Sequence, residues 1–286
     1  MKKIVLKDLN TKRFTSLIKR SASMDNLIFI TINGNSYEST SYNKNKSALK
    51  SVYADLEKMC SEYSNKIDEP VKVQFSNANK LISSLALVGG ENVNITIDIE
   101  DDNYAKKITI KNEQISLTIA CADKEAVDFL TIPEKVRDTL FENMSEFQYS
   151  IRISDDEFRY IKQLFALNKD SVRIFFSLYN GEVNVSEIES TDENVRLAVN
   201  SIIESGSYDT FNGFDKLYSK KISILEMNKK DDVNNYLKCF NKQYFDWIDC
   251  DYAFYIEYHT NKIKFVSYDE ETSIKTYVML TPVRFA

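Results

Sequence analysis

Few residues in this sequence could carry catalysis. His259 is the sole histidine, so a histidine-based triad or a multi-histidine metal site has at most one candidate member. We expect it to be an exposed turn residue of a hairpin. The cysteines, Cys60, Cys121, Cys239 and Cys250, form no CxxC pair and indicate neither a zinc site nor a disulfide framework.

Two acidic runs could bind a divalent cation. They are Glu100-Asp101-Asp102 and Asp231-Asp232, which a solvated turn and a helix N-terminus explain more simply. The common signatures of phosphate loops, dinucleotide sites, zinc proteases and serine hydrolases are absent. We therefore expect a protein that is not an enzyme and that needs no cofactor or metal.

A less ordinary pattern lies on the predicted helices. They begin at Thr11, at Asn77 or Asn79, at Asp155 and at Lys229, and each combines an apolar side with a basic or small polar side. Any one basic stripe is most often a solvated helix face, but four in a chain of net charge −6 favour a local surface for phosphates. The candidate residues are Lys12, Lys19, Arg20, Lys80, Arg159, Lys162, Lys169, Lys238 and Lys242.

An internal repeat organises the elements that position these helices. A strand, a helix, a strand, an Asn-Gly turn and a strand occur near the N-terminus and again in the second half, so that Phe14 and Gly34 correspond to Ile161 and Gly181. Each copy continues with a further helix and a three-strand meander. The repeat predicts an α+β fold in which two similar domains of antiparallel sheet each carry two helices on one face.

The alternation of apolar and polar residues stops in the charged stretch 123-146. This predicts a first domain at 1-122, a connector at 123-146 and a second domain at 147-286. No apolar run approaches the length of a membrane helix, so we expect no membrane partner and a cytoplasmic location, in the host if the protein comes from a phage. The open sheet edges need protection, which a closed ring of subunits supplies.

The sequence resembles the DNA sliding clamps, the ring-shaped processivity factors of phage replication and of the proliferating cell nuclear antigen type. The resemblance is strongest in ISDDEFRYIKQLFALNKDSVRIFFSLYNGEVNVS, in NANKLISSLALVGGENVNITID and in the C-terminal YVMLTPVRFA. It implies a DNA-clamp fold and a ring, here a homotrimer, whose helices line a hole for double-stranded DNA of any sequence. It also implies that a DNA polymerase and a clamp loader bind through short peptides.

The same resemblance suggests where those peptides bind. The segment LTIPE, at 130-134, is similar to the connector of eukaryotic-type clamps, and Thr281-Pro282 stands where the family's last strand leads into its partner-binding tail. The candidate groove residues are Phe129, Leu130, Ile132, Pro133, Pro282, Val283 and Phe285. The alternative is that these apolar residues seal the connector against a sheet.

Departures from the family pattern keep other interpretations open. Each half is longer than usual, the connector runs on past Pro133, and 206-216 has no obvious counterpart. A monomeric clamp-like polymerase accessory protein would bind DNA on one basic face. A virion or scaffold protein of repeated β domains would share the composition without needing basic helices.

Overall fold

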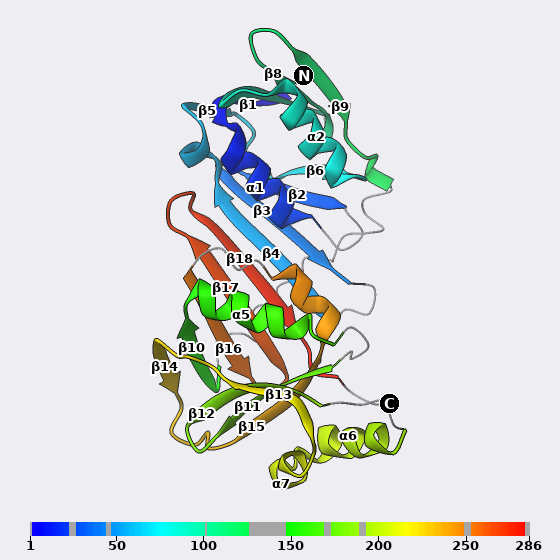
Figure 1. Ribbon diagram of the computed structural model, residues 1–286. Coiled ribbons are helices and arrows are strands. Elements are labelled where there is room, and N and C mark those ends of the chain that lie inside the picture. Colours follow the sequence, from blue (N-terminus) through cyan, green and yellow to red (C-terminus); the bar gives the residue numbers. More distant parts are fainter. Residues whose placement is uncertain are drawn as a thin grey trace. The chain divides into compact units, whose positions relative to one another are not determined.

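The protein is described by a computed structural model that covers residues 2–22, 27–43, 47–100, 102–125, 147–168, 173–188, 193–248 and 253–283. The chain forms two compact units (Figure 1). Unit 1 holds Met1–Leu140 with Tyr268–Tyr277, and unit 2 holds Phe141–Ser267 with Val278–Ala286. No helix among these described residues is long and apolar enough to cross a membrane.

Unit 1 is built from two antiparallel sheets and two α-helices. Its elements are β1 (Lys2–Asn10), α1 (Thr11–Ser21), β2 (Ile28–Asn33), β3 (Ser36–Tyr42), β4 (Ala48–Asp55), the 3-10 helix η1 (Leu56–Met59), β5 (Glu62–Asn65), β6 (Val71–Phe75), α2 (Ala78–Val88), β7 (Asn92–Ile99), β8 (Ala105–Lys111) and β9 (Ser116–Ala120).

Unit 2 follows the same plan with one addition. Its elements are β10 (Tyr149–Ile153), α5 (Asp155–Phe165), β11 (Arg173–Tyr179), β12 (Glu182–Ile188), α6 (Glu193–Ser205), α7 (Tyr208–Asn212), β13 (Lys216–Lys221), β14 (Glu226–Lys229), β15 (Tyr236–Asn241), the 3-10 helix η2 (Lys242–Trp247), β16 (Ala253–His259), β17 (Lys262–Asp269) and β18 (Ile274–Leu280). The first half of β18 and the turn before it are counted with unit 1.

The strand order is the same in both units. One sheet runs β5-β1-β7-β8-β9 in unit 1 and β14-β10-β16-β17-β18 in the second copy, and the other runs β4-β3-β2-β6 and β13-β12-β11-β15. Each strand therefore has a counterpart at the same place in the second copy. The α+β class and the antiparallel sheets predicted from the sequence are confirmed.

Local signals place the elements where the sequence predicts them. Asn10, Asn77 and Ser154 cap α1, α2 and α5 with a side-chain oxygen that accepts from a backbone N–H of the first turn. α2 ends at Gly89, whose φ of 65° suits glycine. In the second hairpin Asn180 and Gly181 both have positive φ, as a tight two-residue turn between twisted strands requires.

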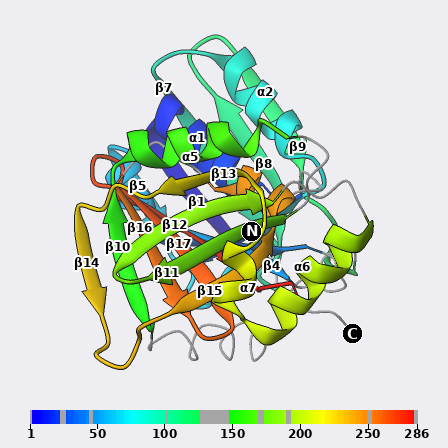
Figure 2. The ribbon, with the colours of Figure 1, turned by 60° about the horizontal axis from the view of Figure 1, so that its bottom comes forward.

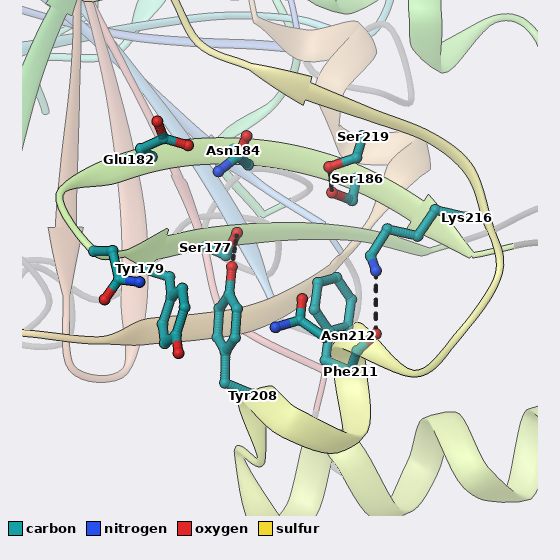
Figure 3. Close-up of a pocket in the computed structure, with 11 residues that line it drawn as sticks. Ser177, Tyr179, Glu182, Asn184, Ser186, Tyr208, Phe211, Asn212, Lys216 and Ser219 are labelled. Atoms are coloured by element: carbon teal, nitrogen blue, oxygen red, sulfur yellow. Dashed lines mark hydrogen bonds between the residues drawn. The ribbon is translucent and has the colours of Figure 1, made fainter.

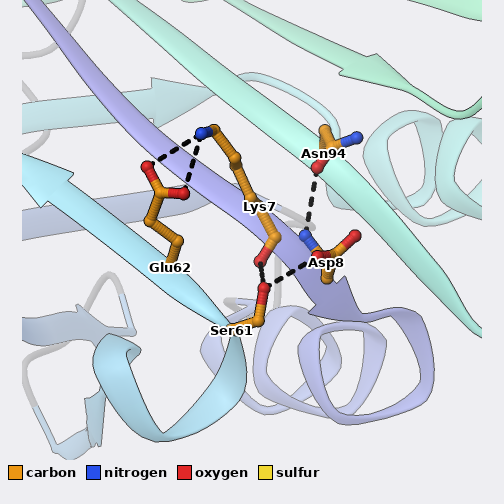
Figure 4. Close-up of polar contacts among 5 residues, drawn as sticks. All are labelled: Lys7, Asp8, Ser61, Glu62 and Asn94. Atoms are coloured by element: carbon orange, nitrogen blue, oxygen red, sulfur yellow. Dashed lines mark hydrogen bonds and ion pairs between the residues drawn. The ribbon is translucent and has the colours of Figure 1, made fainter.

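A bulge in β1 turns the chain toward α1 (Figure 4). Asp8 has a φ of 48°, and the register with β7 shifts between Leu6 and Leu9. The Asp8 N–H does not take part in the strand pairing of β1 with β7 and donates instead to Asn94 Oδ1 at 3.0 Å. The Ser61 hydroxyl donates to Asp8 Oδ2 at 2.8 Å. The bulge is thus held by side chains on both sides just before the helix begins.

Three predictions about unit 2 are wrong. The helix expected at Lys229–Phe240 is replaced by β15, because Tyr236–Asn241 pairs with β11 and the ladder outweighs the helical spacing of its apolar residues. The polar stretch before β13, expected as part strand and part loop, forms the helices α6 and α7. His259 is buried at the end of β16, where its Nε2 lies 3.4 Å from Glu257.

Candidate nucleic-acid interface

The helices α1 and α2 lie side by side on one face of unit 1 (Figure 1). α1 packs over β2, β3 and β4, and α2 packs over β8 and β9. The Thr11 N–H donates to the carbonyl of Glu91 at 2.9 Å, so the first residue of α1 lies beside the segment that follows the C-terminus of α2. Their inner sides are apolar: Leu17, Ile18, Leu81 and Leu85 are fully buried.

The outer sides of α1 and α2 are basic. α1 has lysine or arginine at positions 12, 13, 19 and 20 and no acidic residue, and α2 has one lysine and no acidic residue. Lys12, Lys19 and Lys80 are exposed, and none of the three ammonium groups pairs with another described residue. Among the candidate residues that the structure describes, these three are both exposed and unpaired, so their charge is available to a phosphate.

Arg20 does not belong to this exposed set. Its side chain is 4 % exposed, because position 20 is one helical turn after the buried Leu17 and falls beside the apolar stripe. The sequence prediction that Arg20 faces solvent is wrong. Its neighbour Arg13 is half-buried and forms an ion pair with Glu271 at 3.0 Å.

The corresponding helix of unit 2, α5, is electrostatically different. Its first turn holds three acidic residues, and Arg159 pairs with Asp156 at 2.5 Å and with Asp155 at 3.4 Å. Lys162 donates to the carbonyl of Ile248 at 3.0 Å. Lys169 lies outside the described residues. α5 has three carboxylates and two cations, so it should attract phosphates much less strongly than α1 does.

Neither Lys238 nor Lys242 is on an α-helix, in contrast to the prediction. Lys238 lies half-buried in β15. Lys242 begins η2, and its ammonium lies 3.4 Å from the carboxylate of Glu187 and donates to the carbonyl of Asn168. The Lys242 and Glu187 side chains are 13 % and 0 % exposed, so this pair is structural.

Most of the candidate peptide groove lies outside the described residues, namely Phe129, Leu130, Ile132, Pro133 and Phe285. Pro282 and Val283 are half-buried. The Val283 N–H donates to the Cys239 carbonyl at 2.9 Å, and its side chain packs on a small apolar cluster of unit 2. Whether these segments form a groove remains a prediction.

Metal-binding side chains do not cluster among the described residues. No group of three histidine, cysteine or acidic side chains gathers among them. A hydrogen bond from Lys124 lowers the pKa of Asp102, and burial raises the pKa of Cys60 to about 11 and that of Cys121 to about 12. These thiols are protonated at neutral pH, so neither is an activated nucleophile.

Comparisons with known proteins agree with the architecture at the level of fold. No family model matches the chain, and no curated protein matches its sequence. Solved structures do match, and among them are structures of PCNA proteins that are covered over nearly their whole length. The chain therefore has the PCNA-like clamp fold.

Three of these structures show how similar the chain is to PCNA proteins in sequence and in fold. A. fulgidus PCNA bound to the C-terminal region of FEN-1 is 13 % identical, with a TM-score of 0.64 and full coverage of both chains. PCNA from Thermococcus kodakaraensis is 9 % identical, with a TM-score of 0.66 and 98 % and 100 % of the two chains covered. The PCNA2–PCNA3 complex from Sulfolobus tokodaii is 11 % identical, with a TM-score of 0.62 and coverages of 97 % and 98 %.

Proposed function

We propose that this chain is the subunit of a DNA sliding clamp, a non-enzymatic ring that encircles double-stranded DNA and tethers a replicative DNA polymerase. The observation that carries the proposal is the identical strand order of the two units, each with helical elements after its first and sixth strands. A chain made of two equivalent units can continue the same arrangement from one copy to the next, and such head-to-tail contacts form a ring when the rotation between copies closes.

The repeat indicates which edges join. Within unit 1 the first half of β18 is the neighbour of β4, and Tyr277 contacts Tyr53 edge-on at 5.7 Å between ring centroids. The counterparts of β18 and β4 are β9 and β13, and both are sheet edges. We infer that β9 of one copy pairs with β13 of the next, repeating a strand pairing that the chain already makes.

The backbone and side chains at both edges suit this pairing. The Cys121 N–H donates to the carbonyl of Lys106 at the start of β8. Because backbone N–H groups alternate in direction along a strand, those of Thr118 and Ala120 point away from β8, toward the unpaired edge of the sheet. Ile115 and Leu217, next to or within the two edges, are among the exposed large apolar side chains. An unprotected edge of this kind favours pairing with another strand.

In the ring, α1 and α2 would supply the DNA contacts. Lys12, Lys19 and Lys80 would meet phosphates, which gives binding without base readout. We further propose that the ring is a homotrimer and that each chain has domains at 1-122 and 147-286 joined by a connector at 123-146. Short peptides of the polymerase and the clamp loader would bind at the connector. We also propose a cytoplasmic location, in a host if the chain is phage-encoded.

The test of the ring is the mass in solution. We expect a species near three times the 33.1 kDa chain mass. Thr118→Pro removes one edge N–H and should give a folded monomer, because proline is tolerated on an edge strand when its position faces outward. Thr118→Val keeps the N–H and should keep the ring.

The two variants are matched, since both lose the hydrogen bond between the hydroxyls of Thr118 and Thr109 at 3.2 Å. A wild-type protein that is monomeric at micromolar concentration would overturn the ring and favour a monomeric accessory protein. Equal assembly of both variants would overturn the β9 edge as the interface.

A further inference from the structure

The segment between β12 and β13 is what unit 2 adds to the repeat. The equivalent connection in unit 1 runs only from Tyr42 to Ala48, whereas this one runs from Ile188 to Lys216 and contains α6 and α7. Both helices lie together beside the β13-β12-β11-β15 sheet (Figure 2). The repeat is complete without them, so the addition calls for a role of its own.

The sheet face under the addition has two chemically different parts. One part is apolar, where Phe175, Ile188 and Cys239 pack with Val199 and Ile202 of α6. This part explains how the helices are held. The other part is polar and is not filled.

The polar part is the floor of a pocket of about 450 Å³ (Figure 3). Asn184, Ser186 and Ser219 line the floor, and Tyr208 and Phe211 of α7 form the opposite wall. Tyr208 is fixed in place, because it stacks on Tyr179 at 4.1 Å and donates to Ser177 Oγ at 3.4 Å. Packing alone would place apolar side chains under a helix, whereas these residues leave hydrogen-bonding groups facing a space of ligand size.

A β-bulge brings a cation to one end of this pocket. The pairing of β12 with β13 shifts between Glu187 and Ile188, so that Ile188 faces Lys216 while Ser186 faces Ser219. The bulge puts Lys216 on the same face as Ser219, which strict alternation over three residues would prevent. Bulges often redirect a side chain in this way next to functional sites.

The Lys216 ammonium is held by carbonyl groups and is only partly offset by the Asp215 carboxylate, because burial has the larger influence on the pKa of Lys216. It donates to the carbonyls of Phe211 at 3.2 Å and Phe214 at 3.5 Å and lies 4.6 Å from the centre of the Phe211 ring. An ammonium has three N–H groups, so one remains for a ligand. Burial lowers the pKa of Lys216, a cost that a bound anion would offset.

We propose that this pocket binds an extended peptide through a carboxylate, which Lys216 and the Ser186–Ser219 hydroxyl pair receive. These two hydroxyls bond each other at 2.9 Å, which leaves one O–H to donate to the carboxylate (Figure 3). The pocket follows β12 from Glu182 to Ser186, a distance of about 13 Å along a strand. The side-chain amide of Asn184 then lies where it can pair with a peptide backbone. Glu182 marks the opposite end of the pocket, where its carboxylate is already paired with Lys221 at 2.6 Å.

The same charges argue against a nucleotide. Lys216 is the one cation lining the described pocket, and Glu182 at its other end is already paired with Lys221 at 2.6 Å. A di- or triphosphate would bring several negative charges to a single cation, which leaves most of them unmatched. A peptide with a single carboxylate matches the arrangement.

The experiment is affinity selection with mass spectrometry on the full chain. The probe is a mixture of N-acetyl tetrapeptides, supplied once as free acids and once as C-terminal amides. We expect the wild-type protein to retain carboxylate-bearing peptides at least tenfold above peptides that lack a carboxylate. Retention of free acids alone identifies the C-terminal carboxylate, and retention of amidated peptides with Asp or Glu identifies a side-chain carboxylate.

Three variants decide whether the retained peptides occupy this pocket. Lys216→Met and Asn184→Leu should each lower retention at least tenfold, and Lys229→Met, on exposed β14, should leave it unchanged. If Lys216→Met lowers the melting temperature, Asn184→Leu decides alone. No retention by the wild type, or equal retention by the pocket variants, overturns the proposal. The readout needs neither DNA nor a ring, so it is independent of the clamp proposal.

Discussion

Neutralising the exposed lysines of α1 and α2 should weaken the salt dependence of DNA binding by an amount that can be calculated. The perturbation is the triple substitution Lys12→Gln, Lys19→Gln and Lys80→Gln. These ammonium groups are exposed and do not pair with other described residues, so removing them leaves no buried carboxylate behind. The fold should be unaffected.

The magnitude follows from counterion release. Each phosphate contact contributes about 0.9 to the slope of log K against log salt concentration, so three contacts contribute about 2.7. Over a fourfold rise in salt the wild-type protein should therefore lose about 40-fold more affinity than the variant when the lysines of one subunit contact the duplex, and more when those of further subunits in the ring do so. The variant should bind more weakly at low salt and approach the wild type as salt rises.

The assay is fluorescence anisotropy with a labelled linear duplex, repeated across a salt series. The matched control is Lys66→Gln, Lys111→Gln and Lys229→Gln, which changes the net charge equally with exposed lysines that are outside the helices. The control should keep the wild-type slope. An equal fall in slope for both triple variants would show that overall charge matters and that the α1–α2 face does not.

Further predictions concern the paired charges and the thiols. Arg159→Gln should change DNA affinity less than about twofold, because two carboxylates already neutralise Arg159; a loss as large as that of Lys12→Gln would contradict this. Lys242→Met should lower the free energy of unfolding by about 3–5 kcal/mol in chemical denaturation, since it leaves Glu187 buried and unpaired, and adding Glu187→Gln should restore much of the loss. At pH 8.5 Cys60 should react with iodoacetamide about a hundredfold more slowly in the folded than in the unfolded chain, because its pKa is about 11 instead of 9.0. Equal rates in the folded and unfolded chain at pH 8.5 would refute the raised pKa of Cys60. The same raised pKa contributes stability to the folded state below pH 9, and this contribution is lost as the pH rises through about 11.

Much of the fold could be predicted from local signals. Caps at Asn77 and Ser154, the turns after Asn33 and Asn180 and the alternating runs of the meanders each depend on neighbouring residues, and the structure confirms them. The strand β15 could not be predicted in this way. Its apolar residues recur at helical spacing, and only pairing with β11, distant in sequence, makes it a strand.

The candidate site was predictable only in part for the same reason. Exposure of Lys12 and Lys19 follows from helical periodicity. Periodicity places Arg20 only at the border of the apolar stripe, and its burial also depends on how closely the helix packs on its sheet. Lys242 pairs with Glu187 on another strand, which no local pattern reveals. The polar pocket was missed because it depends on α7 covering β12 and on a bulge that redirects Lys216.

The central claim, that the protein encircles DNA, is tested most directly by blocking the ends of its substrate. Rings would be threaded onto linear duplex fixed to a bead at one end, and the free end would then be capped with a bulky protein block. Washing with about 1 M salt screens phosphate contacts almost completely. We predict that the protein stays on the capped DNA through this wash and is released when a restriction enzyme cuts the duplex; release by salt alone, with both ends still blocked, would contradict the account.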